Sequence, residues 1–190
     1  MKSIKNTRTL VLSALLAALT YIATSVIKIP TPTMGYVHIG DSFVLLSGFL
    51  LGPVAGGLSA GIGSMLSDLL GGYATWAPGT FTIKLATAMT AALVFRALSR
   101  SSDNKNRLHL FPKTILAGIA GEAVMIFGYF LYNILMLTIV NAGSESITLS
   151  AAIAESLAEI PFNVAQAVVG IGLSTVLLPV TIGLPKKQLS

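Results

Sequence analysis

Two opposite charges stand inside neighbouring apolar stretches of this sequence. Asp68 lies near the end of one stretch and Lys84 near the start of the next, with Tyr73 and Trp76 in the loop between them. An isolated charge at the centre of a bilayer costs at least about 2.5–3.5 kcal/mol, so an ionisable residue in such a place is treated as functional by default. Two alternatives are open: Asp68 and Lys84 neutralise each other as a structural pair, or they contact a polar ligand.

Further polar side chains recur at helical spacing in the last two apolar stretches. They are Glu122, Tyr129 and Asn133 in one stretch and Glu155, Glu159, Asn163 and Gln166 in the other. The first three fall within about 40° of one another around a helix, and the other four within about 80° if that helix continues through Pro161. Carboxyl, amide and phenol groups hydrogen-bond polar ligands, but they also link neighbouring membrane helices. Both roles are open for these residues.

Together the polar faces predict one pocket that opens outward and is capped by loop residues. The candidate ligand-contacting residues are His38, Asp68, Trp76, Lys84, Glu122, Tyr129, Asn133, Glu159, Asn163 and Gln166. A cation, carboxylates, amides and aromatic faces suit a flat, polar heteroaromatic ligand, which they hold by stacking and hydrogen bonds.

Several kinds of chemistry are absent from the sequence. There is no cysteine, which excludes disulfides, thiol nucleophiles and thiolate metal sites. Neither an HExxH metal motif nor a Walker-type phosphate-binding loop is present. Glu122 and Glu159 could form the acid–base pair of an intramembrane enzyme, but no nucleophile or metal set accompanies them. We therefore expect no catalytic residue, no metal and no cofactor.

The composition assigns these residues to a membrane protein. Of the 190 residues, 54% are hydrophobic and 10% are charged, and the mean hydropathy is +0.82. Soluble domains have about 25% charged residues, so this chain cannot cover a soluble surface. Its length allows roughly six spans of about 20 residues. We predict an all-α integral membrane protein with one domain over residues 1–190 and six transmembrane helices.

Six apolar stretches are the candidate spans. They cover residues 9–27, 41–52, 53–70, 79–98 and 114–140, and a last stretch that begins between 151 and 161 and ends near 184. A cleaved signal peptide is the alternative for the first. The second is only about 18 Å long as a helix, so it needs an extra turn or a thinner bilayer to cross. The third has small residues four apart from Gly52 to Ser64, which predicts a central, closely packed helix.

Basic residues indicate the orientation. They cluster at the N-terminus, between 96 and 113, and at the C-terminus, regions that the positive-inside rule places in the cytoplasm. Both termini are thus predicted to be cytoplasmic, and the loops at 28–40, 71–78 and 141–150 to face outward. Because membrane topology explains the net charge of +5, no nucleic-acid partner is expected.

With these residues placed, the chain resembles a substrate-binding (S) component of the energy-coupling factor (ECF) vitamin transporters. The resemblance covers nearly the whole chain and depends on an ordered series of motifs. The series is Gly40–Asp41, then GFLLGPVAGGLSAGIGSMLSDLL, the aromatic loop, PGTFTIK, and LAEIPFNVAQ ending at Gln166. The pair Ala14 and Ala18 in the first stretch also fits the family.

The resemblance implies a mechanism and a set of partners. Such a protein binds one small vitamin or precursor from outside, in a pocket roofed by the first, third and fifth loops. It has no ATP site of its own and docks through Ala14 and Ala18 onto a membrane coupling subunit driven by two ATPases. Small residues suit reversible docking because they pack without deep interlocking. The implied location is the plasma membrane of a prokaryote.

The signature is most similar to the subgroup that takes hydroxymethylpyrimidine or pyridoxine, with the riboflavin S component as a near relative. Riboflavin and pantothenate remain alternative ligands. Two other classes of function are also open: a membrane scaffold in which the polar groups only hold helices together, and a stand-alone secondary transporter.

Overall fold

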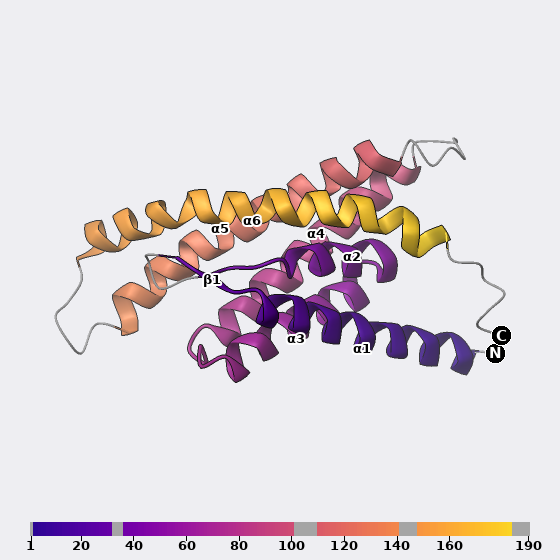
Figure 1. Ribbon diagram of the computed structural model, residues 1–190, viewed down its shortest axis with the longest axis horizontal. Coiled ribbons are helices and arrows are strands. Elements are labelled where there is room, and N and C mark those ends of the chain that lie inside the picture. Colours follow the sequence, from indigo (N-terminus) through magenta and orange to yellow (C-terminus); the bar gives the residue numbers. More distant parts are fainter. Residues whose placement is uncertain (1, 32–35, 101–109, 141–147, 184–190) are drawn as a thin grey trace.

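The computed structural model describes residues 2–31, 36–100, 110–140 and 148–183, which form six helices and two very short strands (Figure 1). The helices are α1 (Lys2–Val26), α2 (Asp41–Leu51), α3 (Pro53–Leu70), α4 (Ala77–Arg100), α5 (Leu110–Val140) and α6 (Leu149–Gly183). Their number and order agree with the sequence prediction. The first residues of α1 and the last residues of α6 lie at the same end of the bundle (Figure 1).

Only four of the described helices are long and apolar enough to span a membrane: α1, α4, α5 and α6. The prediction of six transmembrane spans was therefore wrong. With 11 residues, α2 is about 16 Å long, roughly half the hydrocarbon thickness. The 18 residues of α3 include four glycines, three serines and Asp68, which lower its apolar character. The outer surface of the bundle is apolar, with residues such as Leu70, Val26 and Val168 more than 60% exposed.

The short α2 is enclosed by protein. It packs against α1, α3, α4 and α6, and most of its side chains are buried. A short helix is tolerated at membrane depth when other helices, and not lipid, surround it. The sequence singled out α3 as the central helix, and α3 does pack against α1, α2 and α4, but α2 has the larger number of neighbouring helices.

Two glycines allow the close packing of this inner part. Gly52 joins α2 to α3 with a φ of 86°, a conformation that residues with a Cβ rarely adopt. Pro53 follows at the first position of α3, where its missing N–H costs nothing. At Gly63, a Cβ would lie only 2.4 Å from the carbonyl oxygen of Ala17, so α1 and α3 meet backbone to backbone.

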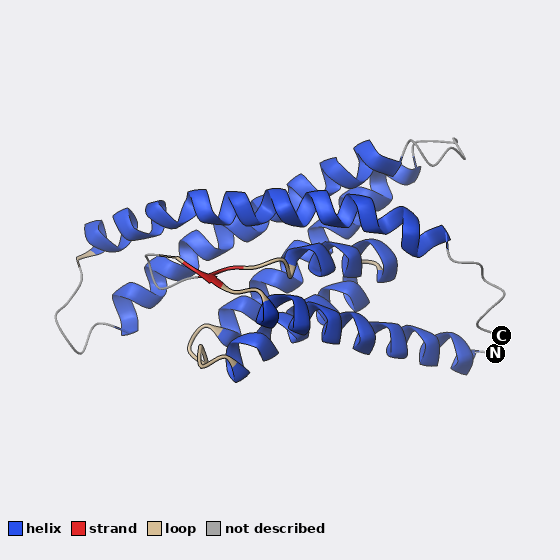
Figure 2. Ribbon diagram, viewed as in Figure 1, coloured by secondary structure: helices blue, strands red, loops and turns tan. Residues whose placement is uncertain are grey.

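The connection between α1 and α2 contains the strands β1 (Ile29–Pro30) and β2 (Tyr36–Val37), which Figure 2 shows in red. They pair antiparallel, with Ile29 opposite Val37 and Pro30 opposite Tyr36. A pairing of two residues has no periodic pattern, so the sequence predicted only a loop here. The second strand carries Tyr36 to α3, where it contacts Asp68, and is followed by His38.

The last helix is continuous through both of its prolines, Pro161 and Pro179. This answers the open question about its start, because α6 begins at Leu149, before Pro161. The predicted polar face of this helix therefore exists, with Glu159, Asn163 and Gln166 on one side.

Candidate functional site

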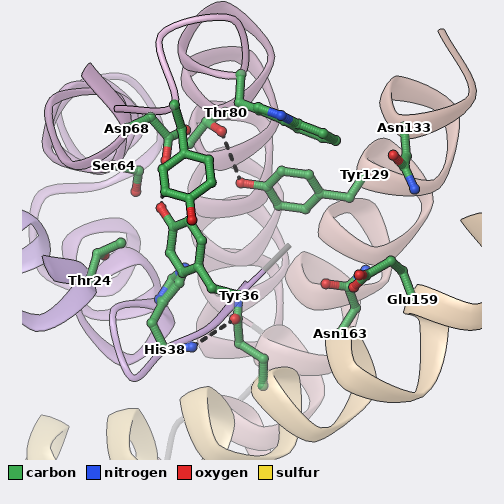
Figure 3. Close-up of a pocket in the computed structure, with 13 residues that line it drawn as sticks. Thr24, Tyr36, His38, Ser64, Asp68, Thr80, Tyr129, Asn133, Glu159 and Asn163 are labelled. Atoms are coloured by element: carbon green, nitrogen blue, oxygen red, sulfur yellow. Dashed lines mark hydrogen bonds between the residues drawn. The ribbon is translucent and has the colours of Figure 1, made fainter. Parts of the chain in front are cut away.

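A cavity of about 80 Å³ lies between the helices and the α1–α2 connection (Figure 3). Its lining comes from α1, α3, α4, α5, α6, the loop between α3 and α4, and the residues just before α2. The lining residues are Thr24, Tyr36, His38, Ser64, Asp68, Tyr73, Trp76, Thr80, Tyr129, Asn133, Glu159, Asn163 and Gln166. Segments far apart in the sequence thus converge on one polar and aromatic cavity.

All but two of the predicted ligand-contacting residues line this cavity. The exceptions are Lys84 and Glu122, which are buried beneath it with 0% and 1% of their surface exposed. Sequence reasoning missed the hydroxyls of Thr24, Ser64 and Thr80 as lining groups. Serine and threonine are common in membrane helices, so neither residue type gave a signal on its own. The spacing of four between Ser64 and Asp68 was the available clue.

Lys84 forms an ion pair with Asp41 and not with Asp68, which corrects one of the two alternatives for the buried charges. Its Nζ lies 2.5 Å from Asp41 Oδ1, and both side chains are fully buried. Asp41 Oδ2 accepts a hydrogen bond from Gln166 Nε2 at 2.6 Å, and Gln166 Oε1 accepts one from the backbone N–H of His38 at 3.0 Å. We call Asp41, Lys84, Gln166 and the His38 backbone the ion-pair network.

The ion-pair network explains why Asp41 sits at the start of α2 without capping it. No side-chain hydrogen bond caps this helix, whose N-cap is Gly40. The carboxylate of Asp41 instead joins α2 to α4 through Lys84 and to α6 through Gln166. Both charged groups, the Gln166 side-chain amide and the His38 backbone N–H therefore have partners, as a buried ionic group requires.

Glu122 lies beside the network without joining it. Both of its carboxyl oxygens are buried and have no hydrogen-bond partner in the described part of the chain. α6 approaches both residues at Gly170, where a Cβ would lie 2.9 Å from Asp41 Cβ and 3.3 Å from Glu122 Oε1.

His38 accepts a hydrogen bond at Nδ1 from the backbone N–H of Gly40, at 3.0 Å. A ring nitrogen can accept only in the neutral imidazole. Burial lowers the pKa of His38 to about 3; Asp41 opposes this shift, and Lys84 and Lys28 add to it. The ring is therefore uncharged at neutral pH.

On the α3 side of the cavity, Tyr36 donates a hydrogen bond to Asp68 Oδ1 at 2.5 Å. Burial, and next the charge of Asp68, raise the pKa of Tyr36 well above its ordinary value, so the phenol stays protonated. The Lys28 ammonium lies 4.4 Å from the centre of the Tyr36 ring and 5.4 Å from that of Tyr73. Burial lowers the pKa of Lys28, and the charge of Asp68 partly opposes this.

The opposite side of the cavity carries amides and aromatic rings. Asn133 is 5% exposed, and Tyr129 donates to Thr80 Oγ1 at 3.3 Å. Glu159 Oε1 accepts a hydrogen bond from Thr31 Oγ1 at 2.6 Å, which ties α6 to the α1–α2 connection. Aromatic faces and amides together can hold a flat ligand with polar edges. Among the described residues, no group of His, Cys, Asp and Glu is arranged to hold a metal ion.

Three matches to known proteins bear on this chain. The family model "ECF-type riboflavin transporter, S component" matches residues 4–182. A curated protein of Pyrococcus woesei, described as an uncharacterized protein in the gap 3' region, is 36% identical over 109 residues. This match covers 57% of the present chain and 66% of the length of that relative.

The third match is a solved structure of the S component of a bacterial ECF transporter. It has a TM-score of 0.67 and 21% sequence identity, and the match covers 96% of this chain and 99% of the other. At this identity the similarity shows the fold. The long apolar helices and the family match over nearly the whole chain make this an integral membrane protein. It belongs to the family of ECF-type riboflavin transporter S components, which are transporter components and not enzymes.

Proposed function

We propose that the protein is the substrate-binding subunit of an ECF-type importer in the plasma membrane of a prokaryote. In this proposal it takes a small heteroaromatic vitamin or vitamin precursor from outside and delivers it to an ATPase-driven coupling module. The observation that carries the proposal is the cavity, where polar and aromatic side chains from five helices face one space. A scaffold whose polar groups only join helices has no need of such a cavity.

The size of the cavity favours a ligand with a single ring. Drug-sized ligands occupy pockets of roughly 300–1,000 Å³, and this cavity holds about 80 Å³. Hydroxymethylpyrimidine and pyridoxine are single rings with polar arms, so they are the preferred candidates. Their rings would stack on Tyr129 or Trp76, and Asn133, Asn163 and Glu159 would bind their polar edges.

Riboflavin is the second candidate, because the family model that matches the chain carries its name. Its three fused rings and sugar-alcohol chain exceed the present cavity. Binding it would require the α1–α2 connection to move outward, breaking the hydrogen bond between Thr31 and Glu159. The two candidates therefore differ in whether the cavity must expand.

Docking on the coupling subunit is proposed to use Ala14 and Ala18. Both are exposed on α1, whereas Leu16 and Thr20 of the same helix are buried against the bundle. Exposed alanines one helical turn apart offer a smooth surface for another helix. Replacing both alanines by leucine should reduce co-purification with the coupling subunit and its ATPases and leave ligand binding unchanged. The matched control is Leu15→Ala on the same exposed side.

The test of the ligand is direct. The purified protein is titrated by calorimetry with 4-amino-5-hydroxymethyl-2-methylpyrimidine, pyridoxine, riboflavin and pantothenate, and mass spectrometry identifies any small molecule that co-purifies. We expect a single-ring compound to bind most tightly, and Asn163→Ala to weaken it about ten-fold or more. The control Val168→Ala changes a lipid-facing residue that is 64% exposed. Failure of all four compounds to bind would favour the scaffold.

A further inference from the structure

Three buried polar atoms on one side of the cavity have no hydrogen-bond partner in the described part of the chain: Thr24 Oγ1, Ser64 Oγ and Asp68 Oδ2. Their residues are only 1%, 1% and 3% exposed, and all three line the cavity. Figure 3 shows them together on one side, with Asn133, Glu159 and Asn163 on the other. We call Thr24, Ser64 and Asp68 the α1–α3 wall.

The packing of two helices brings these residues together. Ser64 and Asp68 stand one turn apart on α3, and therefore on the same face. The close approach of α1 at Gly63, where a Cβ would meet the Ala17 carbonyl, brings Thr24 to that face. The side chains are held by the fold in a position where they cannot reach bulk water.

Asp68 has one oxygen occupied and one oxygen available. Its Oδ1 accepts the hydrogen bond from Tyr36, which fixes the orientation of the carboxyl group. Its Oδ2 makes no hydrogen bond of normal geometry in the described part of the chain, although the Thr80 hydroxyl lies near the carboxyl group, and it can accept another hydrogen bond. A buried polar group without a partner is destabilising, and native proteins retain few of them unless another role requires it.

Unpartnered atoms also occur at Glu122, Ser156 and Thr175, but none of these residues lines the cavity. They are a matched comparison for the α1–α3 wall, because their polar atoms are equally buried and also lack a partner but lie away from the cavity. Among the fully buried polar atoms that lack a partner in the described residues, only those of the α1–α3 wall belong to residues that line the cavity.

We propose that the α1–α3 wall is the subsite that recognises a hydrogen-bond donor on the ligand, namely an exocyclic amino or hydroxymethyl group on its ring. This inference rests on the proposed function and deepens it. Asp68 Oδ2 accepts the donor hydrogen, and the hydroxyls of Thr24 and Ser64 complete the shell around the same group. A neutral donor suffices, because the Lys28 ammonium, held 4.4 Å from the centre of the Tyr36 ring, already attracts the Asp68 carboxylate electrostatically. The amide side of the cavity then binds the opposite edge of the ring.

The experiment combines ligand analogues with wall variants. The ligands are 4-amino-5-hydroxymethyl-2-methylpyrimidine, the analogue that lacks its amino group, and the analogue that lacks its hydroxyl. If riboflavin is the compound that binds, 3-methylriboflavin, which lacks the ring N–H, takes the place of the analogues. Dissociation constants are measured for the wild type and for Asp68→Asn, Ser64→Ala and Thr24→Val.

Asp68→Asn can keep the bond from Tyr36 through its carbonyl oxygen and turns an NH₂ donor toward the cavity. We expect this substitution to weaken binding of the full ligand about ten- to hundred-fold. The affinity for the analogue that lacks the group bound by Asp68 should stay nearly unchanged. Ser64→Ala and Thr24→Val are expected to weaken the full ligand by several-fold to about ten-fold. Neither should lower the melting temperature of the ligand-free protein, because each removes a group that has no partner there.

The control variants Ser156→Ala and Thr175→Val remove unpartnered hydroxyls away from the cavity and should leave the affinity unchanged. If wild type binds a ligand and the wall variants bind it equally well, the subsite is overturned and the proposed function stands. A melting temperature lowered by several degrees in Ser64→Ala and Thr24→Val would also overturn it, because these groups would then have partners in the protein. If no compound binds the wild type, the proposed function falls, and the subsite falls with it.

Discussion

The ion-pair network and the α1–α3 wall are two groups of buried polar side chains that differ in where their hydrogen bonds go. In the network, Lys84, Asp41 and Gln166 satisfy one another and the His38 backbone. In the wall, Thr24, Ser64 and Asp68 keep polar atoms without a partner in the described part of the chain. The hydrogen bonds of the first group join α2, α4 and α6, whereas the second group has donors and acceptors left over that could bind another molecule.

This difference changes how a buried charge in a membrane protein is interpreted. Lys84 carries the strongest signal in the sequence, yet it is fully buried in an ion pair and does not line the cavity. Ser64 and Thr24 carry almost no signal, yet they face the cavity. For a buried polar group, the lack of a hydrogen-bond partner together with a position on the cavity is therefore better ground for proposing a ligand contact than its charge alone.

The largest expected effect comes from breaking the network. Asp41→Leu removes the carboxylate that is hydrogen-bonded to the buried Lys84 ammonium, and removing one partner of a buried pair costs about 3–5 kcal/mol. We expect a strong loss of thermal stability in detergent, measured by the midpoint of unfolding, and poor expression.

The double variant Asp41→Leu/Lys84→Met is the control, because it replaces the pair by apolar side chains of similar size. Replacing both partners of a buried pair is often neutral or stabilising, so most of the stability should return. If Asp41→Leu were as stable as the wild type, the ion pair and hydrogen bonds of the network would not stabilise the fold, and the contrast with the wall would fail.

A smaller effect is expected at Gly170, where α6 approaches both Asp41 and Glu122. A Cβ there would lie 2.9 Å from Asp41 Cβ, so Gly170→Ala should push α6 away from the network and cost about 1–3 kcal/mol. Gly172→Ala, two residues further along α6, is the control because nothing lies within 4 Å of its Cβ position. Equal melting temperatures for the two variants would argue against tight packing around the network.

Much of the fold could be predicted from the sequence. The apolar stretches and their Gly and Pro boundaries predicted the order of the helices, and α3 begins and ends at the expected residues Pro53 and Leu70. The number of membrane spans was wrong because length alone does not say whether a short helix such as α2 contacts lipid or protein. Only the arrangement of its neighbours decides that.

The site could be predicted in part. Helical spacing brought Asn133, Asn163 and Gln166 to one cavity, because periodicity determines which residues share a face. It could not identify the partner of Lys84, since Asp41 and Asp68 are both carboxylates near the same end of the bundle. The choice between them depends on how α2, α3 and α4 rotate against each other, and no local pattern encodes that rotation.

The smallest expected effect concerns His38, which belongs to both regions: its backbone donates to Gln166 and its ring lines the cavity. Its pKa falls from 6.5 to about 3 on folding, so the unfolded chain binds more protons than the folded protein between these values. Stability from the neutral ring is therefore complete above about pH 6.5 and is lost as the pH falls toward 3, by at most about 1.4 kcal/mol per pH unit.

His38→Asn offers an oxygen that can accept the Gly40 hydrogen bond without titrating in this range. The measurement is the unfolding midpoint between about pH 7 and 5, roughly the window in which an ordinary histidine becomes charged. The midpoint should fall more steeply with decreasing pH for the wild type than for His38→Asn. Parallel curves would mean that the ring is not shielded from water and that the cavity is open to solvent on the side of the network.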